Sequence, residues 1–522
     1  GDHRDLHSFP TRRSSDLLDA VIRKQPNNKA PGTDNLRAEL VKYLDEENRK
    51  ALLQFYNDIL QSGKLEDSLH EASVVSIFKK GDSTKLENYR PISLLQTFYK
   101  LLAAMIKNRL TQGLDDGFHS GKSTSHAISL ARRLQSIAEV TGRNISVVML
   151  DWEKAFDRLD HDRLMESLQR LEVPPRLFQL IKDIYTHPKF QVKCEEGSSA
   201  FLRQEAGIRQ GCPLSPYLFI LVMSVAFSDI KNRLHTPKQL EPLPGIYFSE
   251  ILYADDTLIF GDHTASINKL LHEIEVESSY YNMNLNYQKC INLTTNQQIS
   301  TIKFSDGSLV PRKRQAIYLG TVLNDAADNS VELQNRLALA VKTCCQLKLF
   351  WAKANTSAHW KLRVFNAIVR SKLMYGLENL QLTHAEMNKL DAFQMKSLRR
   401  ILNVPPTFID RTQTNQVVRE QVEQYGVDAT NFSQVWKNQK LKLFGHILRA
   451  NHKDPLRQVL FSYNSFAPRN IPLKRRGRPK LDWLQETIKD AYHALGRVAP
   501  PSPTHQDVLQ LVDVATLRCG PF

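Results

Sequence analysis

Apolar side chains recur along the first part of this chain with two distinct periods, and these periods predict its elements. Residues 35–62, 99–110 and 125–140 repeat them every three or four positions, which is the period of an amphipathic helix. The runs at 72–78 and 145–150 are short and apolar, with many β-branched residues, as is typical of strands. The N-terminal part of the chain is therefore expected to mix helices with strands.

The middle of the chain carries two apolar strands with acidic residues at their ends. The run ISVVML ends directly at Asp151, and ILYADDTLIF encloses Asp255 and Asp256 between apolar arms. The second pattern predicts a hairpin whose turn carries the acids. Between these strands, residues 161–171 have helical period, and the apolar stretch 214–234 predicts a buried helix.

Beyond Leu323 the chain becomes helical and basic, with helical period at 331–403, 415–450 and 481–495. The composition is therefore α+β, with strands in the middle and helices at both ends. The whole chain carries a formal charge of +15, and residues 331–400 hold 12 Lys or Arg against 4 Asp or Glu. This excess favours a polyanionic partner, although a solvated basic surface explains it equally well.

Several protein classes are not expected from this composition. The six cysteines form no C-x-x-C pair, which argues against zinc knuckles and a disulfide framework. The longest apolar stretch, 217–227, is too short to span a bilayer, and no signal peptide is visible, so a soluble protein of the nucleus or cytoplasm is expected. Residues 1–17 have no hydrophobic period and resemble a translated sequencing adapter. They are expected to be artefactual or disordered.

Asp151, Asp255 and Asp256 are candidate metal ligands. Carboxylates near the ends of buried strands are costly unless they are paired or bind a metal. Three of them together repel one another unless a cation compensates. Their hard oxygen atoms suit Mg²⁺ or Mn²⁺. The alternative is that Asp151 caps the following helix and the aspartate pair only forms a turn.

Three segments carry a resemblance to a known family: DWEKAFD (151–157), GIRQGCPLSPYLF (207–219) and YADD (253–256). They resemble, in this order, motifs A, B and C of the reverse transcriptases of non-LTR (LINE-type) retrotransposons. Weaker likenesses to the fingers, to motifs D and E and to the thumb of that family lie in KAPGTD (29–34), NYRPISLL (88–95), NLNYQK (284–289), YLG (318–320) and the helices at 330–403.

The resemblance implies a right-hand polymerase fold, with fingers, a palm built on an antiparallel sheet, and a helical thumb. The expected boundaries are 18–145 for the fingers, 146–325 for the palm, 326–405 for the thumb and 406–522 for a helical, basic C-terminal extension. The family's endonuclease is expected to be missing from this chain. An apurinic-type nuclease would lie upstream, and the cysteines of a restriction-like nuclease with a zinc site are not present.

The resemblance also implies roles for single residues near the acids. Asp151 and Asp255 would be the principal ligands of two Mg²⁺ or Mn²⁺ ions, with Asp256 as the neighbouring carboxylate. Lys289 would donate a proton to the leaving pyrophosphate. Phe156 would lie under the sugar of the incoming nucleotide and exclude a 2′-hydroxyl by its bulk, unless it is simply a core residue.

Other matched positions would bind the nucleotide and the template. Gln210 and Gly211 would lie in the turn before the motif B helix, where glycine lets the backbone approach the template–nucleotide pair. Arg90 would clamp the triphosphate through bidentate contacts. Lys79 would assist it, unless the basic turn that contains Lys79 is only solvated. Tyr253, the first residue of YADD, would contact the substrate.

The expected function is RNA-directed DNA polymerisation in retrotransposition. It would add dNTPs to the 3′-end of a DNA primer on an RNA template, with target DNA as a further partner. An RNA-dependent RNA polymerase shares the palm, but YADD and Phe156 argue against it. The other alternative is a catalytically decayed or domesticated RNA-binding protein. The stretch DDGFHSGKST (115–124) supports that alternative, because the fingers loop is shorter here than in the family and lacks its Q-x-G-F-R motif.

Overall fold

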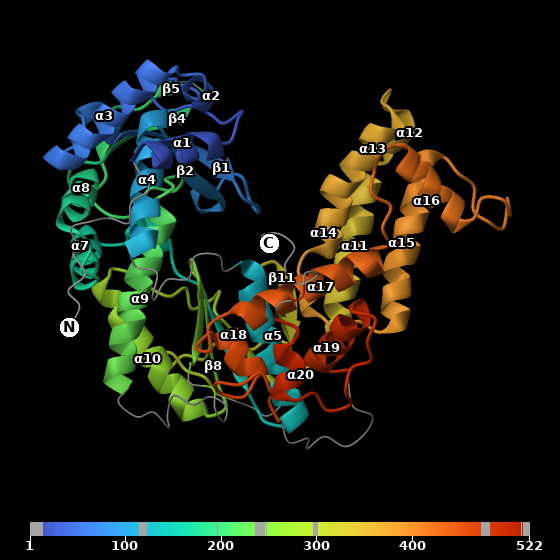
Figure 1. Cartoon of the computed structure of the whole chain (residues 1–522). Coiled ribbons are helices and arrows are strands. Elements are labelled where there is room, and N and C mark those ends of the chain that lie inside the picture. The colour runs from blue at the N-terminus through green and yellow to red at the C-terminus, as the bar shows by residue number, and fades with distance from the viewer. Residues whose placement is uncertain are drawn as a thin grey trace.

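The computed structural model describes residues 14–113, 123–195, 197–234, 246, 248–295, 301–470, 481–512 and 514. Figure 1 shows two arms that rise from a common base. The N-terminal helices and strands form one arm, and the helices between residues 329 and 424 form the other. The chain therefore has the α+β, right-hand arrangement of fingers, palm and thumb that the sequence predicts.

The palm is built on a four-stranded antiparallel sheet with the strand order β7-β8-β3-β9. Every residue of β3 is buried, because both faces of the sheet are covered. This burial explains why its sequence is continuously apolar rather than alternating. The strands predicted on either side of the acids are present. The palm strands are β3 (Ser146–Leu150), β7 (Glu250–Tyr253), β8 (Asp256–Gly261) and β9 (Ile291–Thr294).

One face of the palm sheet, carrying Val148, Leu150 and Ile259, packs into the largest core of the molecule. The buried helix predicted at 214–234 is present in this core as α9, in which Phe219 is fully buried. Two further helices of this core, α8 and α10, were not predicted. Besides helices of the fingers, this core includes α4 (Thr97–Gly113), α7 (His161–Arg170), α8 (Pro175–Thr186), α9 (Ser215–Leu234) and α10 (Thr264–Tyr280).

The fingers hold a second sheet, in which β1 pairs antiparallel with β2 and parallel with β4. Because β4 follows β3 in the chain, the chain leaves the palm and returns to the fingers before the motif B segment. The fingers elements are α1 (Ser14–Lys24), α2 (Ala38–Lys42), α3 (Glu46–Ser62), β1 (Glu71–Phe78), β2 (Tyr89–Leu95), β4 (Lys189–Cys194), β5 (Gly197–Ser198) and β6 (Leu202–Arg203).

The N-terminal region differs from the sequence-based expectation in two places. The single helix expected at 35–62 is divided into α2 and α3, because the Asp45 side chain accepts a hydrogen bond from the Asn48 N–H and caps α3. The segment 1–17, expected to lie outside the fold, contributes its last residues. Helix α1 begins at Ser14, and Leu17 is buried in the largest core.

The opposite face of the palm sheet, with Val147, Leu258 and Phe260, is covered by α5 and the C-terminal helices. Figure 1 shows these C-terminal helices, in orange and red, gathered around α5. The rings of Phe444 and Trp483 meet in this core with centroids 6.4 Å apart. The C-terminal residues therefore complete the palm core. The covering helices are α5 (Thr124–Thr141), α17 (Phe432–Arg449), α18 (Pro455–Leu460), α19 (Trp483–Ala494) and α20 (His505–Leu509).

The thumb has a third core of its own. The helical prediction for 331–403 is confirmed, but the structure divides it into several helices. Gly376, with a φ of 75°, follows the end of α14, and Thr383 caps α15 with a capping box. A π-helical turn at 365–370 joins α13 to α14. The thumb helices are α11 (Asn329–Gln346), α12 (Lys348–Lys353), α13 (Ala358–Val364), α14 (Ser371–Met374), α15 (His384–Leu402) and α16 (Asn415–Gln424).

Some predictions are not tested by the structure. Most of the shortened fingers loop predicted at 115–124 lies outside the described residues. The domain boundaries stay predictions, since β4 crosses back to the fingers and α5 packs on the palm. In the described part of the chain, no helix is long and apolar enough to cross a membrane.

We predict that Phe444→Ala destabilises the protein. The Phe444 side chain is 0% exposed, and its loss leaves a cavity that costs about 3–5 kcal/mol of unfolding free energy. Urea unfolding measures this loss. Phe408→Ala is the matched control, because Phe408 is 84% exposed and its truncation changes stability by less than about 0.5 kcal/mol. Equal stability of both variants would contradict the placement of α17 in the palm core.

Candidate active site

Two strand registers bring the predicted acids to one edge of the palm sheet. The antiparallel register of β3 and β8, continued by one residue, places Asp151 beside Asp256. Tyr253 pairs with Asp256 across a two-residue turn, and Asp255 lies in that turn. Ala254, the other turn residue, has a φ of 52°, which is uncommon for a residue with a side chain. The hairpin predicted from ILYADDTLIF is therefore present, with its acids facing the end of β3.

The three carboxylates influence one another electrostatically. Burial raises the pKa of Asp256 to about 6, and the charges of Asp255 and Asp151 add to that shift. Burial also raises the pKa of Asp151, with Asp255 adding to the shift and the Lys289 ammonium opposing it. Negative charge is therefore concentrated at the edge of the sheet, where a cation is stabilised.

Lys289 lies opposite Asp151 for the same geometric reason. The register of β3 and β9, continued by two residues, pairs these positions. The Lys289 Nζ lies 3.7 Å from Asp151 Oδ2, and both side chains are partly exposed. The Asn286 N–H donates to the Asp151 carbonyl oxygen at 2.8 Å and fixes the loop that carries Lys289. The structure thus brings the predicted proton donor to the predicted metal ligands.

Phe156 is a half-buried residue of the short helix α6 (Ala155–Arg158). Its ring stacks on Phe219 of α9, with centroids 4.9 Å apart and an angle of 18° between the planes. The Ile208 N–H donates to the Phe156 carbonyl oxygen at 2.6 Å. One side of the ring therefore packs against the core, as expected for a core residue. The ring is also partly open to solvent, as expected for a residue that contacts a nucleotide.

Gln210 and Gly211 lie in a loop clamped between α6 and the fingers strand β2. The Gln210 side chain donates to Asp157 Oδ1 at 3.1 Å, and its carbonyl oxygen accepts from the Ser93 N–H at 2.7 Å. A Cβ atom on Gly211, whose φ is 116°, would come within 2.7 Å of the Ser93 carbonyl oxygen. Glycine is therefore required here by close contact with β2 as well as by its backbone angle.

The two predicted phosphate-binding residues differ in their placement. Lys79 follows β1, and its charge offsets part of the rise that burial causes in the pKa of Asp151 and Asp157, so it faces the acids. Arg90 pairs in register with Ile77 on the β1–β2 hairpin, and its side chain is exposed. Among the described residues, Arg90 forms no ion pair with the acids.

Two residues of the site have no role in the sequence-based account. Asp157 receives the hydrogen bond from Gln210 and so links the first and second motifs. Arg209 is 2% exposed, lies over the Tyr99 ring at 5.4 Å, and donates to the His70 carbonyl oxygen. Both belong to the quoted motif segments, and that position is the only signal that the sequence offers for them.

Comparison with known proteins decides the family of this segment. Residues 77–323, which contain the three acids and the loop at 207–211, match the family model described as reverse transcriptase (RNA-dependent DNA polymerase). The chain carries a reverse transcriptase domain. The segments predicted as motifs A, B and C lie within the matched residues, on the palm elements described above.

The relatives of this reverse transcriptase domain belong to non-LTR retrotransposons. The uncharacterized 149 kDa protein of transposon TX1 from Xenopus laevis is 27% identical over 384 residues, which cover 72% of this chain and 29% of that protein. The RNA-directed DNA polymerase from mobile element jockey of Drosophila melanogaster is 28% identical over 405 residues, 74% of this chain and 43% of that protein. This chain thus spans less than half the length of these relatives.

Solved structures offer a more distant likeness. Telomerase from Candida tropicalis, in complex with a fragment of telomeric RNA, aligns with 78% of this chain and 67% of its own, with 12% sequence identity and a TM-score of 0.38.

The reverse transcriptase family implies a divalent metal ion, and the acids of this domain fit one chemically. Their oxygen atoms are hard ligands, and each raised pKa has a neighbouring carboxylate among its causes. In the described residues, however, no group of three or more His, Cys, Asp or Glu is arranged to hold a metal. The carboxylates are thus electrostatically coupled without forming a coordination shell.

We predict that Asp256→Asn raises the thermal midpoint of the metal-free reverse transcriptase domain at pH 7.5 by roughly 1–4 °C. The folded-state pKa of Asp256, about 6, exceeds the ordinary value of 3.8, so the cost of its charge is full above pH 6 and is absent below pH 3.8. The gain should therefore shrink as the pH is lowered from 7.5 to 4.5.

Scanning calorimetry in EDTA at several pH values measures this effect. Asp58→Asn, at an exposed position on α3, is the control and should leave the midpoint unchanged. A gain that is the same at every pH would show that charge repulsion is not its source.

Proposed function

We propose that this chain is the RNA-directed DNA polymerase part of a non-LTR retrotransposon protein, which adds dNTPs to a primer 3′-end on an RNA template. The observation that carries the proposal is the meeting of Asp151, Asp255 and Asp256 at one edge of the palm sheet, where burial and the neighbouring acids raise the pKa of Asp151 and Asp256. Acids held in this state are poised to bind cations.

Asp151 and Asp255 are the proposed principal ligands of two Mg²⁺ or Mn²⁺ ions, with Asp256 beside them. When bound, such ions activate the attacking 3′-hydroxyl and stabilise the leaving pyrophosphate. Lys289 is the proposed donor of a proton to that pyrophosphate. Its contact with Asp151, at 3.7 Å, keeps the ammonium at the acids.

The residues around the acids select and orient the nucleotide. Phe156 lies under the sugar, and its support by Phe219 keeps the ring from yielding to a 2′-hydroxyl. Gln210 and Gly211 present the backbone of their loop to the template–nucleotide pair. Lys79 and the exposed Arg90, together with Tyr253 in the YADD hairpin, contact the triphosphate and the sugar of the incoming nucleotide.

The nucleic-acid partners are an RNA template, a DNA primer and, during insertion, target DNA in the nucleus or cytoplasm. The thumb supports this assignment, because residues 331–400 hold 12 Lys or Arg against 4 Asp or Glu. A hybrid duplex has a wide minor groove and a phosphate backbone, so its binding is shape-based and weakens with salt.

Primer extension tests the proposed function. Purified protein should extend a DNA primer on an RNA template with dNTPs and Mg²⁺ or Mn²⁺, and Asp255→Ala should reduce the rate by about 10³-fold or more. Asp58→Ala is the control for loss of an exposed aspartate and should be fully active. Folded protein that binds the hybrid without extending it would indicate the decayed, RNA-binding alternative. A preference for rNTPs would indicate an RNA polymerase.

We predict that Phe156→Val relaxes sugar selection. A smaller side chain leaves room for a 2′-hydroxyl, so the ratio of kcat/KM for dNTP over rNTP should fall by roughly 10- to 100-fold. Phe156→Tyr keeps the ring and should retain the wild-type ratio. If Phe156 is only a core residue, both variants will leave the ratio unchanged, and Phe156→Val will lower only the stability.

A further inference from the structure

A strained hairpin turn lies between the thumb and the acids. It joins β10 (Gln315–Tyr318) to β11 (Thr321–Asn324), and its two turn residues, Leu319 and Gly320, have φ angles of 45° and 76°. Tight hairpins favour this left-handed geometry, but a leucine adopts it only at a cost. Surrounding contacts must therefore hold the turn in place.

The turn belongs to the neighbourhood of the acids. Tyr318 is buried in the core on the α5 side of the palm sheet, and both Leu319 and Tyr253 pack against that core. Burial raises the pKa of Tyr318, and the charge of Asp256 adds to the shift. A displacement of the turn would therefore also shift the YADD hairpin.

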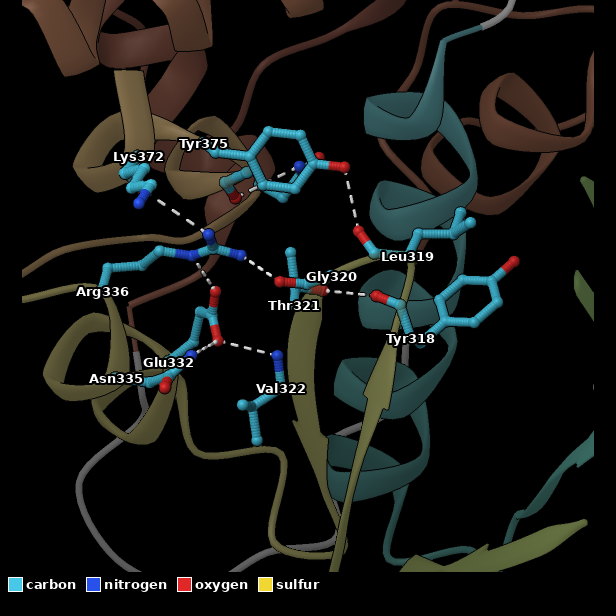
Figure 2. A network of polar contacts seen from close by, with 12 residues as sticks. Tyr318, Leu319, Gly320, Thr321, Val322, Glu332, Asn335, Arg336, Lys372 and Tyr375 are labelled. Atoms are coloured by element: carbon cyan, nitrogen blue, oxygen red, sulfur yellow. Dashed lines mark hydrogen bonds and ion pairs between the residues drawn. The ribbon is translucent and has the colours of Figure 1, made fainter. Parts of the chain in front are cut away.

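The thumb helix α11 holds the turn through a buried ion pair, shown in Figure 2. Glu332 is 0% exposed; its Oε2 accepts from the Val322 N–H at 2.7 Å, and its Oε1 accepts from Arg336 Nε at 2.5 Å. The other end of the guanidinium donates to the Gly320 carbonyl oxygen. The pair thus contacts the backbone of β11 and of the turn, and does not merely join two side chains of one helix.

Tyr375, directly after α14, holds the other turn residue. Its hydroxyl donates to the Leu319 carbonyl oxygen at 2.9 Å and lies 3.2 Å from Thr124 Oγ1 at the start of α5. The Arg336 guanidinium lies over its ring, 4.9 Å from the centroid. Both turn carbonyls are therefore bound by side chains from the base of the thumb (Figure 2).

We propose that Glu332, Arg336 and Tyr375 are positioning residues, which lock the Leu319–Gly320 turn against the catalytic edge and thereby align the 3′-end of a primer held by the thumb. The inference rests on the proposed polymerase function for the identity of this ligand. The thumb carries the basic helices, and Leu319 of the turn packs against the same core as Tyr253 of the YADD hairpin. The network therefore links binding of the duplex by the thumb to the position of the acids.

Tyr375→Phe is the decisive variant, because it removes one hydroxyl, and the side chain is 39% exposed. Substitution of Arg336 would leave the Glu332 carboxylate buried without its partner and would test stability instead. Tyr425→Phe is the matched control. Tyr425 is 44% exposed in the thumb, and its hydroxyl has no hydrogen-bond partner among the described residues.

Fluorescence anisotropy without nucleotides compares two RNA–DNA hybrids of equal length. In the first hybrid the template extends past the primer 3′-end, which is therefore recessed. In the second hybrid the template extends past the primer 5′-end, and the primer 3′-end is blunt. Tyr375→Phe should weaken binding of the first hybrid by roughly 3- to 10-fold, because the turn that has lost this hydrogen bond must be ordered on binding, and should leave binding of the second hybrid unchanged. Tyr425→Phe should change neither affinity.

Equal weakening of both hybrids, or no weakening of either, would overturn the positioning role. Synthesis is not part of this readout. A wild-type chain that binds the recessed end but fails to extend it would therefore contradict the proposed function and leave the positioning role standing.

Discussion

The mutual repulsion of three carboxylates is the constraint on which the arrangement of this molecule depends. Asp151, Asp255 and Asp256 would separate in a flexible chain, yet two antiparallel registers hold them at one edge of the sheet. Burial is the larger cause of the raised pKa of Asp256, and the repulsion by Asp255 and Asp151 adds to it. A strand can hold a charged group against repulsion only when it is itself immobile. Both faces of β3 are covered, one by the core around α9 and the other by α5 and the C-terminal helices.

The same need explains three of the positions with backbone strain, while others, such as Glu172 and Asn403, follow helices elsewhere in the fold. Lys154, Ala254 and Leu319 all have positive φ angles, and each lies in a segment next to the acids. Such backbone conformations persist only where the surrounding structure holds them in place, and they are often found at functional sites. Helix α6, the YADD hairpin and the β10–β11 turn each rest on a separate core or network. The C-terminal helices contribute to this rigidity, although they come from a part of the chain with only weak likeness to the family.

The parts of the fold that could be predicted from the sequence are those in which burial produces a clear pattern. Strand β3 and the hairpin of β7 and β8 are apolar and end in acids, and helix α9 is apolar over most of its length. Strand β4 could not be predicted, because its sequence, KFQVKC, is half-exposed and pairs with a strand more than a hundred residues earlier in the chain. Helix α10 was missed although Ile267, Leu270, Leu271 and Ile274 have helical spacing.

The contacts that join the thumb to the catalytic edge could not be predicted, for a physical reason. In the sequence, Glu332 and Arg336 have the spacing of an exposed helix pair, which contributes little. In the structure both are buried, because they bond to backbone groups of the turn, and such groups carry no sequence signal. A buried ion pair adds little net stability compared with apolar residues of the same size. What this pair provides is a fixed position for Gly320 and Val322, so its value lies in alignment rather than in stability.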